Sequence, residues 1–193
     1  KSIKIIGNKV YSDDELLSIF ELSEGNWFSF LSSSDRYSKE KLEGDIENLE
    51  SFYLDRGYLK YSLESIQVSV SQDKENVFIS MSVLEGEKYT VDEVNIIGDI
   101  PLSENIYEPV LDSLKGQIYS QAQITQIEDY FTNLLGNEGY TFAEVRGNPE
   151  VKDDDELVDL LFIVQPGNRT YARKINFSGN HLTNDEVLRR EMR

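Results

Sequence analysis

The sequence contains no cysteine and one histidine, so it holds no disulfide bond and no thiolate metal site. Basic residues are also scarce: 19 lysines and arginines stand against 36 acidic residues, for a net charge of −17. Such an acidic surface repels phosphates, which excludes a general nucleic-acid-binding protein. The longest apolar run, Leu160–Val164, is far shorter than the roughly 18 residues of a membrane helix. The opening residues show no signal-peptide pattern, and we expect a soluble piece of a longer protein.

What the sequence does contain is an internal repeat. The run Ile3–Asn8 recurs as Val94–Asp99 and again as Ile175–Asn180. Gly57 and the tyrosine after it recur 82 residues later, at Gly139. Because the markers keep their order and spacing, they predict two whole modules and the beginning of a third. We place these modules at residues 1–89, 90–172 and 173–193.

Each module is predicted to contain a strand, two helices and two further strands. In the first module, Ser12 and Glu15 form a capping box that starts a short helix ending near Phe20. Thr183 and Glu186 repeat this box in the third copy. In the second module Ser103 lacks the matching glutamate and Pro109 follows, which predicts a short helix with a weaker start.

The second helix of each module is indicated by an apolar stripe at helical spacing. The stripe comprises Leu42, Ile46, Leu49 and Tyr53 in the first module, and Ile124, Ile127, Phe131 and Leu134 in the second, after a cap at Ser120. Gly57 and Gly139 stand where a helix ends in a left-handed residue. Two strands follow in each module, at 59–70 and 77–84 and at 141–151 and 157–164.

This element order predicts the fold class α/β (α+β). Three strands bury one face only, so both helices should cover one face of a three-stranded mixed sheet. The last two strands form an antiparallel hairpin. If the last strand also pairs with the first, the order is 2-3-1 and the second strand lies at an edge. The joint at residues 85–89 is short, which predicts limited swing between the modules.

Residues that would indicate catalysis or ligand binding are poorly placed. His181 lies in a run typical of a turn, with no second histidine at metal-ligand spacing. The acidic run 153–156 lacks the glycine and alternating ligands of a calcium loop and is typical of a solvated hairpin turn. No glycine-rich phosphate loop follows any predicted strand. We therefore predict no enzymatic activity, no catalytic residue, no metal and no cofactor.

The second strand of the first module carries the clearest binding signal. Its apolar residues occupy odd positions up to Leu63 and even positions from Ile66 onward, which indicates a β-bulge. Either the bulge turns the residues after it outward, or it keeps a long strand over its own core. If this strand is an edge, its unpaired N–H and C=O groups can receive an added strand. The predicted partner-binding residues are Glu64, Ile66, Val68 and Val70.

The first module also has about nine more residues between its helices than the second. They lie around 25–31 and include Trp27, the one tryptophan of the chain. Four large apolar residues in a loop form either a flap packed on the module, which we favour, or a patch that faces a partner.

The repeated unit, with its strand-Gly-Asn openings, resembles the POTRA domain. The runs 42–47, 53–58 and 187–193 are similar to the BamA family of outer-membrane protein assembly factors, over its third and fourth POTRA domains and the start of the fifth. The Trp27 loop fits an aromatic insertion of that third domain. The resemblance implies a periplasmic location, no enzymatic activity and an outer-membrane β-barrel beyond this chain.

The same resemblance implies the partners. They are the lipoprotein BamB at the edge strand with Glu64, Ile66, Val68 and Val70, unfolded outer-membrane proteins, and further lipoproteins such as BamD at the fifth domain. Two other functions stay open: a POTRA array of a two-partner secretion transporter or autotransporter assembly factor, and an unrelated repeat domain that binds a small ligand.

Overall fold

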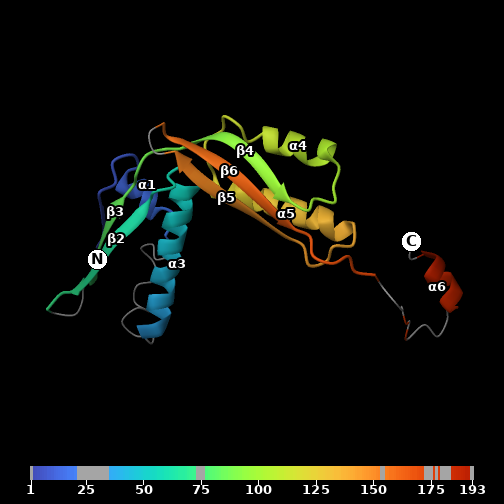
Figure 1. Cartoon of the computed structure of the whole chain (residues 1–193). Helices are drawn as coiled ribbons and strands as arrows, with labels where there is room; N and C mark the ends of the chain where they lie inside the picture. The colour runs from blue at the N-terminus through green and yellow to red at the C-terminus, as the bar shows by residue number, and fades with distance from the viewer. Residues whose placement is uncertain are drawn as a thin grey trace.

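The computed structural model describes residues 2–20, 35–72, 77–152, 155–171, 176, 178 and 184–191. Three features singled out in the sequence fall outside these residues: the Trp27 loop, His181 and the Thr183 cap. Figure 1 shows two sheet-and-helix modules that follow each other along the chain.

The first module forms a three-stranded sheet. Its elements are β1 (Ser2–Ile6), α1 (Asp13–Leu17), α3 (Asp35–Leu54), β2 (Ser62–Val70) and β3 (Val77–Leu84). The strand order is β1-β3-β2, with β1 parallel and β2 antiparallel to β3. The predicted 2-3-1 order is therefore confirmed, and β2 is an edge strand.

The second module repeats this arrangement. It contains β4 (Thr90–Gly98), α4 (Glu104–Asp112), α5 (Gln121–Asn137), β5 (Glu144–Lys152) and β6 (Leu157–Gln165), with the strand order β4-β6-β5. A further helix, α6 (Asp185–Glu191), follows along the chain. The mixed α+β fold predicted from the sequence is confirmed.

The helix ends follow the predicted capping chemistry. The side chain of Ser12 accepts the N–H of Glu15 at 3.3 Å, and that of Ser120 accepts the N–H of Gln123 at 3.3 Å. Ser103 forms no side-chain cap bond, which agrees with the weaker start predicted for this helix. The glycines after α3 and α5 adopt left-handed conformations, with φ +98° at Gly57 and +96° at Gly139.

Several element boundaries differ from the sequence prediction. The second strand begins at Ser62 rather than 59, because residues 55–57 and 59–60 form turns. Leu59 packs against the core of the second module, while Tyr61 is buried in the first. The strand β5 likewise begins at Glu144 rather than 141. Apolar residues in the turns before these strands pack into the cores, so the alternating pattern in the sequence starts before the strand does.

Each module has its own hydrophobic core under one face of the sheet. In the central strands the inward side chains are almost fully buried and alternate with more exposed ones. They are Val77, Ile79, Met81 and Val83 in β3, and Val158, Leu160, Phe162 and Val164 in β6. The helix stripes pack on them through residues that include Leu49 and Tyr53 in α3, and Ile124 and Phe131 in α5. The predicted stripes thus face the sheets, except that Ile46 is not part of the first core and Asp45 is the buried residue of that turn.

The two modules are bonded to each other at a short joint. The N–H of Tyr89 donates to the carbonyl oxygen of Gly57 at 2.9 Å, and the carbonyl oxygen of Tyr89 accepts the N–H of Tyr119 at 3.1 Å. Tyr89 is buried in the second core, which Leu59 of the first module also contacts. In the described residues, no helix combines the length and apolar character needed to cross a membrane.

Candidate functional site: the β2 edge

The strand β2 pairs with β3 on one side only, and it contains the predicted bulge. Leu63 pairs with Val83 and Ser65 with Ser82, so Glu64 is the extra residue. The hydroxyl of Ser82 donates to the Glu64 carboxylate at 3.3 Å. Beyond the bulge the register is regular through Val70.

The register determines which backbone groups of β2 face away from β3. The carbonyl oxygen of Val83 lies toward β1, because a Cβ added to Gly7 would stand 2.1 Å from it. Backbone polar groups alternate sides along a strand, so Met81, Ile79 and Val77 also direct theirs toward β1. The residues of β3 that bond β2 are therefore Ser82, Ser80 and Phe78, whose partners are Ser65, Gln67 and Ser69.

It follows that Ile66, Val68 and Val70 direct their N–H and C=O groups to the free side of β2. Here "free side" means the side of an edge strand that lies away from the central strand of its sheet. Three of the four residues predicted as partner-binding thus present the backbone groups that an incoming strand would pair with. Their even numbering follows from the bulge, since an unbulged strand would have presented odd-numbered residues after Leu63.

The side chains of the same three residues lie on the helix-covered face of the sheet. Ile66 pairs with Met81, Val68 with Ile79 and Val70 with Val77, and paired residues share a face. The register therefore favours the interpretation in which the bulge keeps these residues on the core side of the strand, over the one in which it turns them to the opposite face. The bulge restores the phase, so that apolar residues on both sides of Glu64 point the same way.

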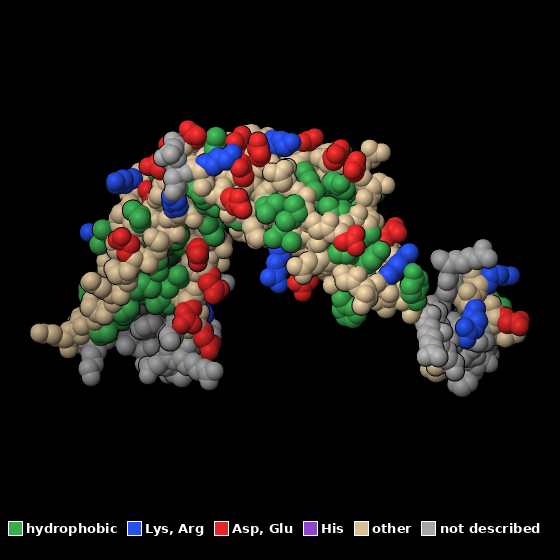
Figure 2. Space-filling view, in the orientation of Figure 1, with side chains coloured by type: hydrophobic (Ala, Val, Ile, Leu, Met, Phe, Trp, Pro, Cys, Tyr) green, Lys and Arg blue, Asp and Glu red, His purple; other side chains and the backbone are tan. Residues whose placement is uncertain are grey.

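These side chains nevertheless stay accessible at the rim of the core. Ile66 is 36 %, Val68 50 % and Val70 53 % exposed, whereas their partners on β3 are buried. Figure 2 shows hydrophobic side chains gathered on the first module between β2 and α3, with carboxylates on the helix side. The site therefore combines unpaired backbone groups with an apolar strip running alongside them.

The buried charged side chain of Glu85 serves the fold of the first module rather than a ligand. Glu85, at the end of β3, accepts the hydroxyl of Tyr53 at 2.8 Å and the N–H groups of Lys9 and Val10 at 2.8 and 3.1 Å. Burial and this bond to Glu85 hold the pKa of Tyr53 far above its usual value. Because the contacts of Glu85 are donors within its own module, it ties β3 to the loop before α1.

The described residues contain little that would suit a small ligand. A hollow of about 260 Å³ on the outer face of the second sheet is lined by Glu144, Arg146, Asn148, Ile163 and Gln165. Its charged members pair with each other at 3.1 Å, and both are well exposed to solvent. Within the described part of the chain, no cluster of three or more acidic or histidine side chains is arranged to hold a metal ion.

Sequence and structure comparisons agree on what the chain is similar to. The profile of the POTRA family, described as "Surface antigen variable number repeat", matches residues 1–86 and 89–167. The outer membrane protein assembly factor BamA of Neisseria meningitidis is 31 % identical over 99 % of this chain, and that of Buchnera aphidicola is 31 % identical over 100 %. The chain spans only 24 % and 31 % of the length of these two relatives.

Among solved structures, a crystal structure of Haemophilus influenzae BamA POTRA3-5 superposes with a TM-score of 0.74 at 27 % identity. The match covers 99 % of this chain and 75 % of that one. The resemblance to BamA noted in the sequence is therefore confirmed.

Proposed function

Because this chain belongs to the POTRA family, we propose that it is a periplasmic scaffold region of the machinery that assembles outer-membrane β-barrel proteins. Its relatives are named outer membrane protein assembly factors, and this name supports the proposal. The working unit is the β2 edge, which receives extended segments of other proteins as an added strand. No step of this function requires a catalytic group, and the chain acts by holding its partners.

The observation that carries the proposal is the outward backbone of Ile66, Val68 and Val70 on a strand that, in the described residues, has β3 as its single neighbour. An added strand would gain several hydrogen bonds at roughly 0.5–1.5 kcal/mol net each. Association costs about 4 kcal/mol or more. Backbone pairing alone therefore gives weak, sequence-tolerant binding, and tight binding requires burial of the exposed apolar side chains as well.

This energy balance fits two kinds of partner. Transient binding suits unfolded outer-membrane protein segments, whose alternating apolar residues can lie along the apolar strip. Stable binding suits a folded accessory lipoprotein of the BamB kind that presents an edge of its own. Further lipoproteins would bind beyond the second module, in the part of the protein that starts at residue 173 and contains α6. We also propose the module boundaries 1–89 and 90–172, with a third module from 173.

The deciding experiment is a pull-down of a BamB-like lipoprotein by the chain and its Val68→Pro variant. Proline at this position removes an N–H that faces the free side, so pairing with β3 should survive. The matched control is Val68→Ala, which trims the side chain and keeps the donor. We expect the proline variant to lose binding with an unchanged circular dichroism spectrum. Undiminished capture by a folded Val68→Pro chain would contradict the proposal.

A POTRA array of a two-partner secretion or autotransporter assembly factor is the alternative. It would use the same edge with a different number of modules. The gene sequence beyond Arg193 distinguishes the two, because it gives the number of modules before the barrel.

A further inference from the structure

The second module has an edge strand equivalent to β2, and positions in the two edges can be matched through their registers. The inward residues Met81 and Ile79 of β3 recur as Phe162 and Leu160 of β6, each 81 residues later. Ile66 and Val68 pair with the first two, while Gly147 and Pro149 pair with the second two. Ile66 therefore corresponds to Gly147, and Val68 corresponds to Pro149.

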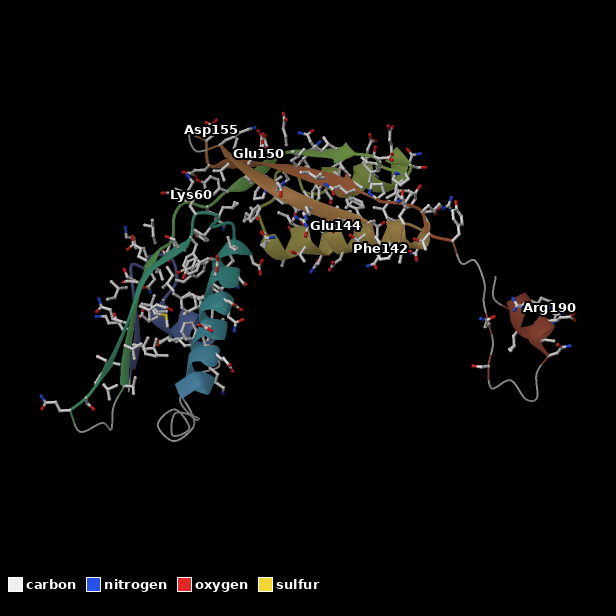
Figure 3. All side chains as sticks on the ribbon, turned by 60° about the horizontal axis from the view of Figure 1, so that its bottom comes forward. Lys60, Phe142, Glu144, Glu150, Asp155 and Arg190 are labelled. Carbon is white, nitrogen blue, oxygen red and sulfur yellow. The ribbon has the colours of Figure 1, made fainter. Side chains whose placement is uncertain are left out.

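The backbone of β5 alternates in the same sense as that of β2. The carbonyl oxygen of Val164 lies toward β4, because a Cβ added to Gly98 would stand 2.1 Å from it. The residues of β5 that face the free side are accordingly Val145, Gly147, Pro149 and Val151, and the register is unbroken along the strand. Figure 3 shows β5 running from Glu144, at the end away from the first module, toward Glu150 near the joint.

Two of these free-side positions of β5 offer no N–H donor to an added strand. The N–H of Gly147 already donates to Oε1 of Glu128, on α5, at 2.6 Å. Proline has no N–H, so position 149 lacks a donor altogether. An incoming strand would also bring its carbonyl oxygen against the Glu128 carboxylate, and the two acceptors would repel each other. The positions equivalent to the centre of the β2 edge are thus closed in β5.

The position of Glu128 is occupied by an apolar residue in the first module. Positions in α3 and α5 can be matched through an equivalent bond after each helix. The N–H of Tyr58 donates to the carbonyl oxygen of Tyr53, and the N–H of Tyr140 donates to that of Leu135, so the two helices are offset by 82 residues. At this offset Glu128 corresponds to Ile46, whose side chain cannot accept a hydrogen bond. The repeat therefore differs between its two copies at the three positions that decide access to the edge.

Close packing of α5 on β5 is a further difference between the two edge strands. A Cβ at position 147 would stand 2.6 Å from Cγ2 of Ile124 and 2.9 Å from the Phe162 ring. Glycine is required there for the helix to approach, and this approach brings Glu128 within reach of the strand. The equivalent position in β2 carries the side chain of Ile66, which is partly exposed.

We propose that Glu128 and Pro149 close the second edge to added strands, so that partners are received at β2 and not at β5. This inference rests on the proposed function of β2, and it adds that the array discriminates between two edges of the same fold. The difference between the two edges comes from residues of the modules themselves and is present before any partner binds.

The test uses a synthetic peptide of alternating valine and threonine, capped by lysines and carrying a photoreactive phenylalanine analogue. It is cross-linked to the whole chain, and the attachment sites are mapped by mass spectrometry. Four proteins are compared: wild type, Val68→Pro, the opened variant Glu128→Ala/Pro149→Val, and the opened variant combined with Val68→Pro. Glu128→Gln alone is the matched control, because its amide oxygen can still accept the N–H of Gly147.

We expect wild type to cross-link at β2 only and the combined variant to cross-link at β5. Two restored donors should strengthen capture at β5 by about tenfold or more. Cross-linking of wild type at β5, or an opened variant that is folded and gains nothing there, would overturn the inference. Failure of wild type at β2 together with a gain of the opened variant at β5 would instead refute the proposed function of β2, while the closure of β5 by Glu128 and Pro149 would stand.

A second measurement needs no peptide and reports on the native edge directly. Amide exchange at Gly147, followed by NMR, should accelerate at least about tenfold in Glu128→Ala, since the N–H loses its acceptor. The exchange rate should change little in Glu128→Gln. Equal exchange rates at Gly147 in wild type and Glu128→Ala would show that the carboxylate does not occupy the edge, and would overturn the inference. This measurement decides the inference even if the opened variant does not fold.

Discussion

Oδ1 of Asp55 accepts the backbone N–H of Ala122 at 2.7 Å, so the end of the long helix in the first module caps the first turn of α5 in the second. Ala122 is the second residue of α5, and its N–H is one of the donors that a helix leaves unpaired at its start. The negative carboxylate also suits the positive end of the helix dipole. One residue thus bonds the two modules at a fixed place.

We expect Asp55→Ala to loosen the joint without unfolding either core. Loss of a cap costs about 0.5–2 kcal/mol. Spin labels on cysteines introduced at Ser51 and Asn133, both exposed, should show a broader distance distribution in the variant. The chain has no native cysteine to interfere. Asp55→Asn keeps an acceptor oxygen and should stay close to wild type; equal widths in all three proteins would contradict the prediction.

The stacked tyrosines Tyr53 and Tyr61, whose rings lie 4.4 Å apart, should respond oppositely to the same substitution. Among the described residues the buried hydroxyl of Tyr61 has no hydrogen-bond partner, whereas that of Tyr53 donates to Glu85. Tyr61→Phe should therefore be neutral or stabilising by up to about 1 kcal/mol, and Tyr53→Phe should cost about 1–3 kcal/mol. Urea unfolding of the two variants measures both, and a larger loss in Tyr61→Phe would contradict this account.

The pH dependence of unfolding gives a second check on Tyr61. Burial and the charge of Glu50 raise the pKa of Tyr61 to about 12. A raised folded-state pKa means that folding favours the neutral hydroxyl, so stability is complete below the unfolded pKa near 10 and falls as the pH rises toward 12. We expect Tyr61→Phe to lose less stability than wild type between these values. Parallel stability curves for the two proteins would argue against the assignment.

Glu85 should be a sensitive acidic position of the first module, because its side chain is buried and accepts several hydrogen bonds. Glu85→Ala would leave the buried Tyr53 hydroxyl and the partly buried N–H groups of Lys9 and Val10 without their acceptor. Unpaired buried groups cost about 1–3 kcal/mol each. The exposed Glu93 is a suitable control, and Glu93→Ala should change the free energy of unfolding by less than about 0.5 kcal/mol. Similar urea midpoints for the two variants would contradict the role given to Glu85.

Two glycines of the second module should respond in opposite directions to alanine. A methyl group at Gly98 would meet the carbonyl oxygen of Val164, and the φ of +120° disfavours any side chain; the conformation alone costs about 1–3 kcal/mol. Gly136 lies within α5 with open space around it, so Gly136→Ala should stabilise by about 0.5–1 kcal/mol. Thermal unfolding of both variants gives the comparison, and a tolerated Gly98→Ala would refute the close approach of β4 and β6.

Much of this structure could be predicted because it depends on local patterns. Examples are the helix stripes, the caps at Ser12 and Ser120, and the turn glycines. Each of them depends on residues only a few positions apart in the sequence. The bulge at Glu64 was visible for the same reason, because the alternation of apolar residues changes from odd to even positions there. Its consequence was not, since the face taken by Ile66 and Val68 depends on the register with β3.

The features that required the structure all involve residues distant in sequence. Leu59 continues a strand pattern but packs on the other module, which the alternation of apolar residues cannot reveal. The bond from Gly147 to Glu128 joins a strand to a helix across the module. Pro149 is visible in the sequence, but its meaning for the edge depends on which side its nitrogen faces.

The bond from Tyr89 to the glycine after α3 recurs in the second module, where Thr170 N–H donates to the carbonyl oxygen of Gly139 at 2.8 Å. Asn137 stands at the position equivalent to Asp55. The linkage is therefore part of the repeating unit, and each copy accepts a hydrogen bond from the next copy at the same position. Chains built from more copies would trace a superhelical path with a constant step, whose pitch is set by a few backbone atoms per copy.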